Sequence, residues 1–456
     1  MIIGNLIYIL QQENYDVRRF LRFIYRNLDW YKLAKRNKLT ITPKSILLFA
    51  LTVFLFLALV LTILRSEIYW LLMSLWLTLA YFSLPLIISF SLIFIFPIDR
   101  FFKKRKIKKA GKILETCDKL KVIGITGSFG KTTLKNILEY ILREKYSVVK
   151  TKGNINTDIG VAEFIIANRN LLKKADFFIV EMGAYKPGEI KKLAQMVQPD
   201  YSFLTGIGTS HLERFGSVEN IIKTKFELME HTKQRSFLNA NNKYTLKGYR
   251  KFHPKKCQLV VKKEVENIQK LSDFQGLKFK YRKNVFRTKL LAEHNIELFI
   301  LAIDFAEQIG LEMERIKKGI ENVLPIKHRL QPIFNHNTNI WVIDDSYNGN
   351  YNGFLGGIDV ISKYQGRKIV LTPGIVEQGK ISKKIHQKIG RKYAQSVDLV
   401  LLIDNLATRF IIKGMKAGGF RNFKIYKNTI DAHEDLQNVL QSGDVILFQN
   451  DLSDNY

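Results

Sequence analysis

Two long runs of apolar residues dominate the first hundred positions of the chain. Residues 45–64 carry no charge and are mostly Leu, Phe, Ile and Val, and a second uncharged run covers residues 68–98. In a helix that rises about 1.5 Å per residue, the first run would span about 30 Å, the hydrocarbon thickness of a bilayer. Because only residues 65–67 separate the runs, they predict a transmembrane helical hairpin over 45–98 rather than buried core helices. The second run contains Pro85 and is either one tilted or kinked helix or a helix with an interfacial turn.

Basic segments flank this hairpin on both sides. Residues 1–44 hold nine Lys or Arg against three acidic residues, and a linker over 99–118 is also strongly basic. An apolar stripe at helical spacing runs through the first flank at Val17, Phe20, Leu21, Ile24 and Leu28. It predicts an amphipathic helix that lies either at the membrane interface or on the hairpin. Because Lys and Arg prefer the cytoplasmic side, both termini and the remaining domains are expected in the cytoplasm of a cytoplasmic-membrane protein.

From about residue 119 onward, short apolar runs alternate with helical patterns. This alternation is typical of α/β units around a largely parallel sheet. A helical pattern over 295–323 ends at Leu324-Pro325, where we place a boundary between a central domain, 119–324, and a C-terminal domain, 325–456. The candidate strands are 122–125, 177–180, 201–205, 340–343, 368–371, 399–403 and 445–448.

The net charge of +31 raises the question of a nucleic-acid partner. Much of this charge lies in the two flanks of the hairpin, and the rest is scattered as single lysines rather than gathered in a stripe. The sequence has no recognisable nucleic-acid module, so we expect no nucleic-acid partner and expect anionic membrane lipid beside the flanks. Only Cys117 and Cys257 are present, which gives no support to a disulfide scaffold or a zinc ribbon.

Residues 122–133, Val-Ile-Gly-Ile-Thr-Gly-Ser-Phe-Gly-Lys-Thr-Thr, place a glycine-rich turn between an apolar run and an amphipathic helix. Backbone N–H groups at such a helix start bind phosphate, Lys131 can reach the β- and γ-phosphates, and the Thr132 hydroxyl suits Mg²⁺. Glycine-rich turns also join strands to helices without a ligand, but the Lys-Thr-Thr that follows favours ATP with magnesium. The predicted cofactor-binding residues of the loop are Gly127, Ser128, Gly130, Lys131, Thr132 and Thr133.

Polar residues follow two of the other candidate strands. Glu181 comes directly after 177–180, and His211 comes after the strand and turn 203–210. Open α/β sheets build their sites at the carboxyl ends of the strands. A carboxylate and an imidazole near Thr132 would complete magnesium ligation around a triphosphate, although a single Glu or His is more often ordinary surface chemistry.

Six ordered blocks resemble the Mur ligase family of ATP-dependent amide-bond-forming enzymes of peptidoglycan synthesis. The likeness is to its branch that adds D-alanyl-D-alanine. The blocks are the phosphate loop, 153–160, 181–189, 206–213, His294-Asn295 and 344–348. The resemblance implies a central ATPase domain with a mostly parallel sheet and a C-terminal Rossmann-like α/β domain. It covers about 330 residues, and the hairpin stands where the family has a uridine-nucleotide-binding domain.

The resemblance also implies roles for individual residues. Lys131, Glu181, His211 and Lys225 would be catalytic, and Lys225 sits where many members carry a carbamoylated lysine; an unmodified surface lysine is the alternative. Two magnesium sites would draw on Thr132, Glu181 and His211. Asn295 would approach adenine, and Arg329 and Asp345 would contact phosphate and ribose. The substrate-side residues would be Asn154, Asn156, Thr157, Tyr347 and Asn348.

The implied reaction joins a carboxylate and an amine. ATP would phosphorylate the carboxylate, and the amine would attack the acyl phosphate to give an amide, ADP and phosphate. The expected partners are a cell-wall precursor and an amino acid or dipeptide donor such as D-Ala-D-Ala. The alternatives are a membrane-bound ligase for a lipid-linked or polymeric acceptor such as poly-γ-glutamate, and an ATP-binding membrane scaffold without chemistry. Leu298 departs from the family at a position where a second adenine-facing Asn is expected.

Overall fold

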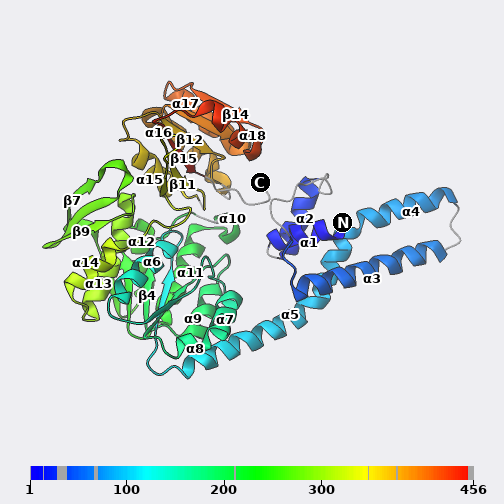
Figure 1. Ribbon diagram of the computed structural model, residues 1–456. Coiled ribbons are helices and arrows are strands. Elements are labelled where there is room, and N and C mark those ends of the chain that lie inside the picture. Colours follow the sequence, from blue (N-terminus) through cyan, green and yellow to red (C-terminus); the bar gives the residue numbers. More distant parts are fainter. Residues whose placement is uncertain are drawn as a thin grey trace. The chain divides into compact units, whose positions relative to one another are not determined.

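The chain forms two units that share the long helix α5 (Leu84–Glu115) (Figure 1). The computed structural model describes residues 2–13, 15–27, 39–65, 70–209, 212–347, 349–375 and 378–449. The boundary between the units falls inside α5, between Lys106 and Ile107. The first unit contains the N-terminal helices, and the second contains both α/β domains.

The first unit consists of helices that follow the apolar runs of the sequence. They are α1 (Ile2–Gln12), α2 (Val17–Arg26), α3 (Pro43–Arg65), α4 (Trp70–Phe82) and the first part of α5. By length and composition, α3 and α5 are long and apolar enough to cross a membrane. Large apolar side chains are exposed along α3, α4 and α5, for example Phe54, Leu75 and Phe94. Contiguous exposed apolar surface of this kind marks a membrane or protein contact.

Helices α3 and α5 pack antiparallel. Lys44 Nζ near the start of α3 pairs with Asp99 Oδ2 at 2.9 Å, and Thr52 Oγ1 donates to Ser91 Oγ at 3.3 Å. The second apolar run is not one continuous helix, because α4 ends and α5 begins at Ser83. Pro85 lies in the first turn of α5, where its missing N–H removes no internal hydrogen bond.

Helix α2 confirms the helical spacing expected from residue 17 as far as Arg26, and Leu28 lies outside the described residues. The Asp16 side chain caps the helix by accepting the Arg19 N–H at 3.2 Å. Residues 99–115, expected as part of a basic linker, continue helix α5.

The central domain is built on a six-stranded sheet in the order β2-β3-β1-β4-β5-β6, and all of its neighbouring strands are parallel. The strands are β1 (Lys121–Thr126), β2 (Val148–Lys150), β3 (Phe177–Glu181), β4 (Tyr201–Leu204), β5 (Arg235–Asn239) and β6 (Cys257–Val260). Alternate residues of β1 point to opposite faces, so Ile123 and Ile125 join one core and Val122 joins the other.

Helices cover both faces of this sheet. One face packs against α6 (Lys131–Arg143), α13 (Ile296–Gln308) and α14 (Met313–Glu321). The other face packs against α7 (Asp158–Ala167), α9 (Glu189–Val197), α11 (Val218–Glu230) and the end of α5. The shorter helices are α8 (Arg169–Leu172), α10 (Leu212–Phe215) and α12 (Lys243–Phe252).

A three-stranded antiparallel sheet is added to the central domain. Its strands are β7 (Val265–Lys270), β8 (Leu277–Tyr281) and β9 (Asn284–Thr288). Phe279 and Phe286 bury their rings in the same core as α13. This sheet therefore widens the core of the central domain.

The C-terminal domain has a second six-stranded sheet, in the order β10-β11-β15-β12-β13-β14. Only its β10–β11 pair is antiparallel. The strands are β10 (Gln331–Asn335), β11 (Ile340–Asp345), β12 (Lys368–Thr372), β13 (Leu399–Ile403), β14 (Phe423–Tyr426) and β15 (Val445–Gln449). Helices α15 (Tyr351–Ile361), α16 (Ser382–Ser396) and α17 (Leu406–Ala417) cover one face, and α18 (Thr429–Glu434) and α19 (Leu436–Val439) lie on the other. The expected α/β class with two sheet domains is confirmed.

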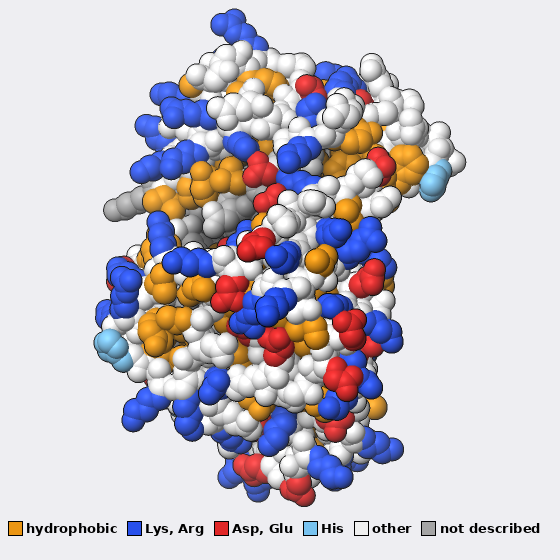
Figure 2. Space-filling model, turned by 90° about the vertical axis from the view of Figure 1, so that its left-hand side faces the viewer, with side chains coloured by type: hydrophobic (Ala, Val, Ile, Leu, Met, Phe, Trp, Pro, Cys, Tyr) orange, Lys and Arg blue, Asp and Glu red, His pale blue; other side chains and the backbone are white. Residues whose placement is uncertain are grey.

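Basic side chains are spread over the face of the molecule that Figure 2 shows. Figure 2 shows Lys and Arg side chains scattered over one face of the molecule, with acidic and apolar side chains between them. This distribution matches the scattered lysines of the sequence.

Candidate active site

The loop between β1 and α6 has the backbone that close approach to phosphate requires. Gly127 has φ +154°, and a Cβ built there would lie 2.0 Å from Thr205 Oγ1. Gly130 precedes α6 with φ +77°, a left-handed conformation that favours glycine. The loop is tied to the next strand by the Ser128 N–H, which donates to the Gly206 carbonyl at 2.7 Å. These glycines leave the N-terminal N–H groups of α6 accessible to an anion.

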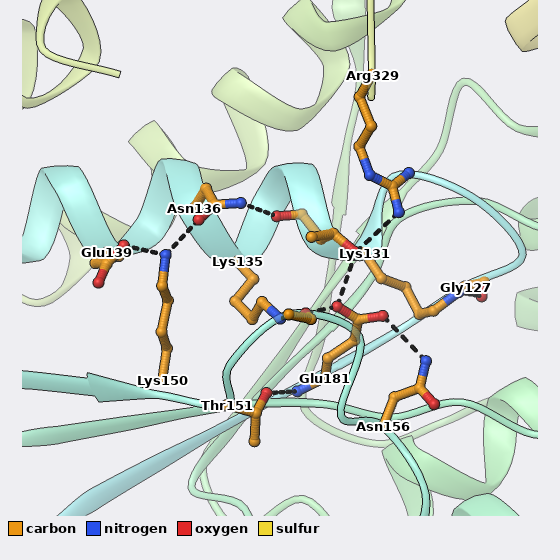
Figure 3. Close-up of polar contacts among 12 residues, drawn as sticks. Gly127, Lys131, Lys135, Asn136, Glu139, Lys150, Thr151, Asn156, Glu181 and Arg329 are labelled. Carbon is orange, nitrogen blue, oxygen red and sulfur yellow. Dashed lines mark hydrogen bonds and ion pairs between the residues drawn. The ribbon is translucent and has the colours of Figure 1, made fainter. Parts of the chain in front are cut away.

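Lys131 is the first residue of α6 and folds back over the loop. Its Nζ donates to the Gly127 carbonyl at 2.9 Å (Figure 3). Burial lowers the pKa of Lys131, and the Glu181 carboxylate opposes this shift. Its ammonium group therefore lies where the phosphates of a nucleotide at this loop would pass. Thr133, another predicted residue of this motif, is buried at the start of α6.

Two predicted residues from other parts of the chain, Glu181 and Arg329, contact Thr132. Its Oγ1 donates to Glu181 Oε2 at 2.9 Å and accepts a hydrogen bond from Arg329 Nη2 at 3.1 Å. Glu181 ends β3 beside the loop, whereas Arg329 comes from the segment that leads into the C-terminal sheet. Burial alone would raise the pKa of Glu181, but Lys131 and Lys135 outweigh it and hold that pKa below its usual value. His211, predicted to join this group, lies outside the described residues.

The donors at Thr132 suit magnesium. Mg²⁺ in nucleotide sites is held by one or two protein oxygens, water and the phosphates themselves. A hydroxyl and a carboxylate lie 2.9 Å apart beside a phosphate loop, so Thr132 and Glu181 fit this pattern. Among the described residues, no group of three or more His, Cys, Asp or Glu side chains is arranged to hold a metal by itself.

Lys225 lies in α11 and is almost completely buried. Burial, aided by the nearby charge of Lys131, lowers the pKa of Lys225 to about 7. Glu189, Glu227 and Glu181 partly oppose the shift. A neutral amine is therefore accessible at physiological pH, and an amine must be neutral to react with carbon dioxide.

The predicted substrate-side loop follows β2 and approaches Glu181. Asn156 Nδ2 donates to Glu181 Oε1 at 3.2 Å. Thr157 instead caps α7, where its Oγ1 accepts the Gly160 N–H at 3.3 Å. Asn154 is exposed on the loop. The structure thus brings Asn156 to the Glu181 carboxylate, while the hydroxyl of Thr157 already serves a structural contact.

A cavity of about 270 Å³ extends from the phosphate loop between the central and C-terminal domains. Asn295, Arg329 and Asp345, to which the resemblance assigns contacts with adenine, phosphate and ribose, all line this cavity. Leu298 also lines it and lies under Gly130, which leaves an apolar wall where a second Asn was expected. Further lining residues that the sequence analysis did not single out are Phe129, Thr205, Asn239, Asn242, Glu297 and Asn350.

Asp345 and Tyr347 complete the C-terminal side of the site. Burial raises the pKa of Asp345 to about 7, and Arg329 opposes this shift. The guanidinium of Arg329 stacks over the Tyr347 ring, 4.4 Å from its centroid. Tyr347 therefore positions the arginine that reaches Thr132. Asn348 lies outside the described residues.

The central and C-terminal domains touch closely at the edge of this cavity. His294 precedes α13, and a Cβ built on Gly356 of α15 would lie 2.7 Å from its Nδ1. Burial lowers the pKa of His294 to about 4, so its ring is neutral at physiological pH. A neutral ring beside a glycine allows the domains to approach closely.

Among the polar groups of the site that sequence reasoning missed, Lys135 and Asn239 contact other site residues directly. Lys135, one helical turn after Lys131, forms an ion pair with Glu181 at 3.1 Å. Asn239 at the end of β5 donates to Glu297 Oε2 at 2.8 Å. The sequence held a signal for each. Lys135 lies four residues after Lys131, on the same face of the helix, and Asn239 stands at the carboxyl end of a strand.

Two family models match the second unit of the chain. Residues 125–306 match the Mur ligase middle domain, and residues 328–449 match the Mur ligase glutamate ligase domain. The two matches coincide with the two sheet domains.

Individual proteins show the same likeness. The UDP-N-acetylmuramoyl-tripeptide–D-alanyl-D-alanine ligase of Haemophilus influenzae is 29% identical over 62% of this chain and 63% of its own length. The Synechocystis ligase of the same name is 28% identical over 72% of this chain and 71% of its own length. A crystal structure of MurF from Acinetobacter baumannii has a TM-score of 0.68 at 26% identity, over 76% of this chain and 77% of that one. The match to the Haemophilus ligase covers less than two thirds of that protein's length.

Proposed function

We propose that this chain, which belongs to the Mur ligase family, is an ATP-dependent ligase that forms an amide through an acyl phosphate. The observation that carries this proposal is the meeting of Thr132, Glu181 and Arg329 beside the phosphate loop. A hydroxyl and a carboxylate for magnesium, with a guanidinium from the opposite domain, are what phosphoryl transfer needs around a γ-phosphate.

The reaction would have two steps. A carboxylate oxygen of the acceptor attacks the γ-phosphorus of ATP, the bond to the β-phosphate oxygen breaks, and ADP leaves. The nitrogen of the amine donor then attacks the acyl carbon, loses a proton, and displaces inorganic phosphate. Lys131 and the N-terminal N–H groups of α6 hold the phosphates. Arg329, from the C-terminal domain, contacts the phosphoryl group that is transferred. Closure of the two domains keeps water from the acyl phosphate.

Magnesium supplies charge neutralisation at the β- and γ-phosphates when it is bound. Thr132 and Glu181 would hold one ion, with His211 as a further ligand. A second ion would need another anionic ligand, and carbamoylated Lys225 would provide it. Support for this comes from the burial of Lys225 and from its pKa of about 7, which makes the neutral amine accessible.

For the substrates, we propose a UDP-N-acetylmuramoyl-tripeptide acceptor and a D-alanyl-D-alanine donor. The names of the relatives support this pair and do not favour a polymer acceptor. The site also argues against a scaffold without chemistry, because its described phosphate-binding and domain-bridging residues remain in contact.

The test is phosphate release by the full chain with Mg-ATP, the UDP-linked tripeptide and D-alanyl-D-alanine, each omitted in turn. We expect release only with both substrates present, and a product mass equal to the two substrates minus water. Release with a lipid-linked acceptor but not with the UDP-linked one would replace the proposed acceptor. ATP binding without turnover on either acceptor would contradict the ligase assignment.

We further propose that the first unit anchors the protein in the cytoplasmic membrane, with the catalytic domains in the cytoplasm and anionic lipid at the basic flanks. Support comes from the exposed apolar side chains of α3, α4 and α5 and from the basic residues after Asp99. We expect the full chain to stay in the membrane pellet after alkaline carbonate extraction. Recovery in the soluble fraction would contradict the anchor.

A further inference from the structure

Lys135 is a fully buried lysine at the centre of the candidate site. It lies one turn after Lys131 on α6, and its side chain is 2% exposed. Its Nζ donates to the Gly153 carbonyl at 2.7 Å. It also pairs with Glu181 Oε2 at 3.1 Å (Figure 3). A buried ammonium group is costly unless its partners are well placed, and both partners here belong to functional segments.

The two partners of Lys135 have different tasks in the proposed reaction. Gly153 begins the predicted substrate-side loop, which continues to Asn156, whose amide donates to the other oxygen of Glu181. Glu181 is the carboxylate placed to bind magnesium. Oε2 of Glu181 is the oxygen shared by Lys135 and Thr132, so the ammonium group and a metal ion would draw on the same atom.

We propose that Lys135 is a positioning residue that couples the substrate-side loop to the metal-binding carboxylate. Through Gly153 it fixes the loop against α6, and through Glu181 it balances the buried carboxylate before the metal arrives. This inference deepens the proposed ligase function and rests on it. Because Lys135 competes with the metal for Glu181, it weakens magnesium binding while it orders the loop that receives the acceptor.

The competition predicts an effect that loss of packing would not cause. Replacing Lys135 by methionine keeps the length and removes the charge. Magnesium should then bind more tightly, because one positive charge next to the ion is gone. We expect the Mg²⁺ concentration for half-maximal binding of a non-hydrolysable ATP analogue to fall about three- to tenfold. The KM for the acceptor should rise about tenfold, because the loop loses its tie to α6.

Lys150→Met is the matched control. Lys150 also contacts α6, but it pairs with Glu139 and Asn136 rather than with Glu181 (Figure 3). We expect its Mg²⁺ half-saturation to stay within twofold of the unmodified protein. Lys135→Gln is the second variant, because it removes the charge but retains a donor that can reach toward Gly153. It should show the same Mg²⁺ shift with a smaller rise in KM.

Calorimetric titration of the ATP analogue at a series of Mg²⁺ concentrations needs no acceptor and no turnover. A failed acceptor assay would therefore count against the proposed substrates alone, while the Mg²⁺ shift would still decide the role of Lys135. If the Mg²⁺ concentration for half-maximal binding of the analogue is unchanged or higher in both folded Lys135 variants, the inference is wrong. If Lys135→Met does not fold, Lys135→Gln decides in the same way.

Discussion

Replacement of Lys131 by methionine is expected to lower kcat about 1,000-fold, because the ammonium group neutralises charge on the transferring phosphoryl group. Lys131 begins α6, and its Nζ lies 2.9 Å from the Gly127 carbonyl, directly over the phosphate loop. Methionine occupies similar volume, so the buried helix start should remain packed. Steady-state phosphate release with saturating substrates measures the effect.

Lys121→Met provides the control for this substitution. Lys121 starts β1, the strand that leads into the same loop, but its side chain is 46% exposed and pairs with Asp200. The control should keep kcat within twofold. A Lys131→Met enzyme that stays within tenfold of the unmodified kcat would show that this lysine does not contact the transferring phosphate.

Lys225→Ala is expected to lower kcat at least about 100-fold, because it removes the carboxylate that carbamoylation would supply to the second metal. The group lost would be a small anion, and alanine leaves space where the buried Lys225 side chain stood. Added formate or acetate should therefore restore part of the activity of Lys225→Ala and should leave Lys131→Met inactive. Failure of every small carboxylate, with the variant folded, would favour a different role for Lys225.

The pKa of Lys225 adds a pH signature to the unmodified enzyme. Since its pKa is about 7, the neutral amine predominates above pH 7 and becomes scarce below it. Carbon dioxide reacts with the neutral amine, so protein depleted of carbon dioxide should regain activity faster at pH 8 than at pH 6 when the same concentration of dissolved carbon dioxide is supplied at both values. Equal recovery at the two values would argue against carbamoylation.

The sequence predicted the parts of the fold whose signal is local. All seven candidate strands are found, because each is a short apolar run bounded by turn residues, and all of them pair in parallel with at least one neighbour. The strands β2, β5, β6, β10 and β14 were missed, and so were β7, β8 and β9 of the small antiparallel sheet. In that small sheet polar residues interrupt the apolar ones, as the two lysines do in Leu277–Tyr281, so its strands lack the continuous apolar run of a central strand.

The site was predictable where the motif itself holds the chemistry. Lys131 and Thr132 follow from the loop, and Glu181 follows from its place after a strand. Lys135 was not predictable in the same way, because a lysine on an amphipathic helix usually faces water. Its burial depends on Glu181 and Gly153, which reach it only after the sheet has formed.

Strand β15 has a consequence for the order in which the protein is made. It lies between β11 and β12, although it follows both in the sequence. During synthesis, the β10–β11 hairpin can pair with the rest of its sheet only after residues 445–449 leave the ribosome. The central domain, including its phosphate loop, can fold earlier. Arg329 precedes that hairpin and Asp345 is its last residue, so a nascent chain would have its phosphate loop in place before Arg329 can reach Thr132.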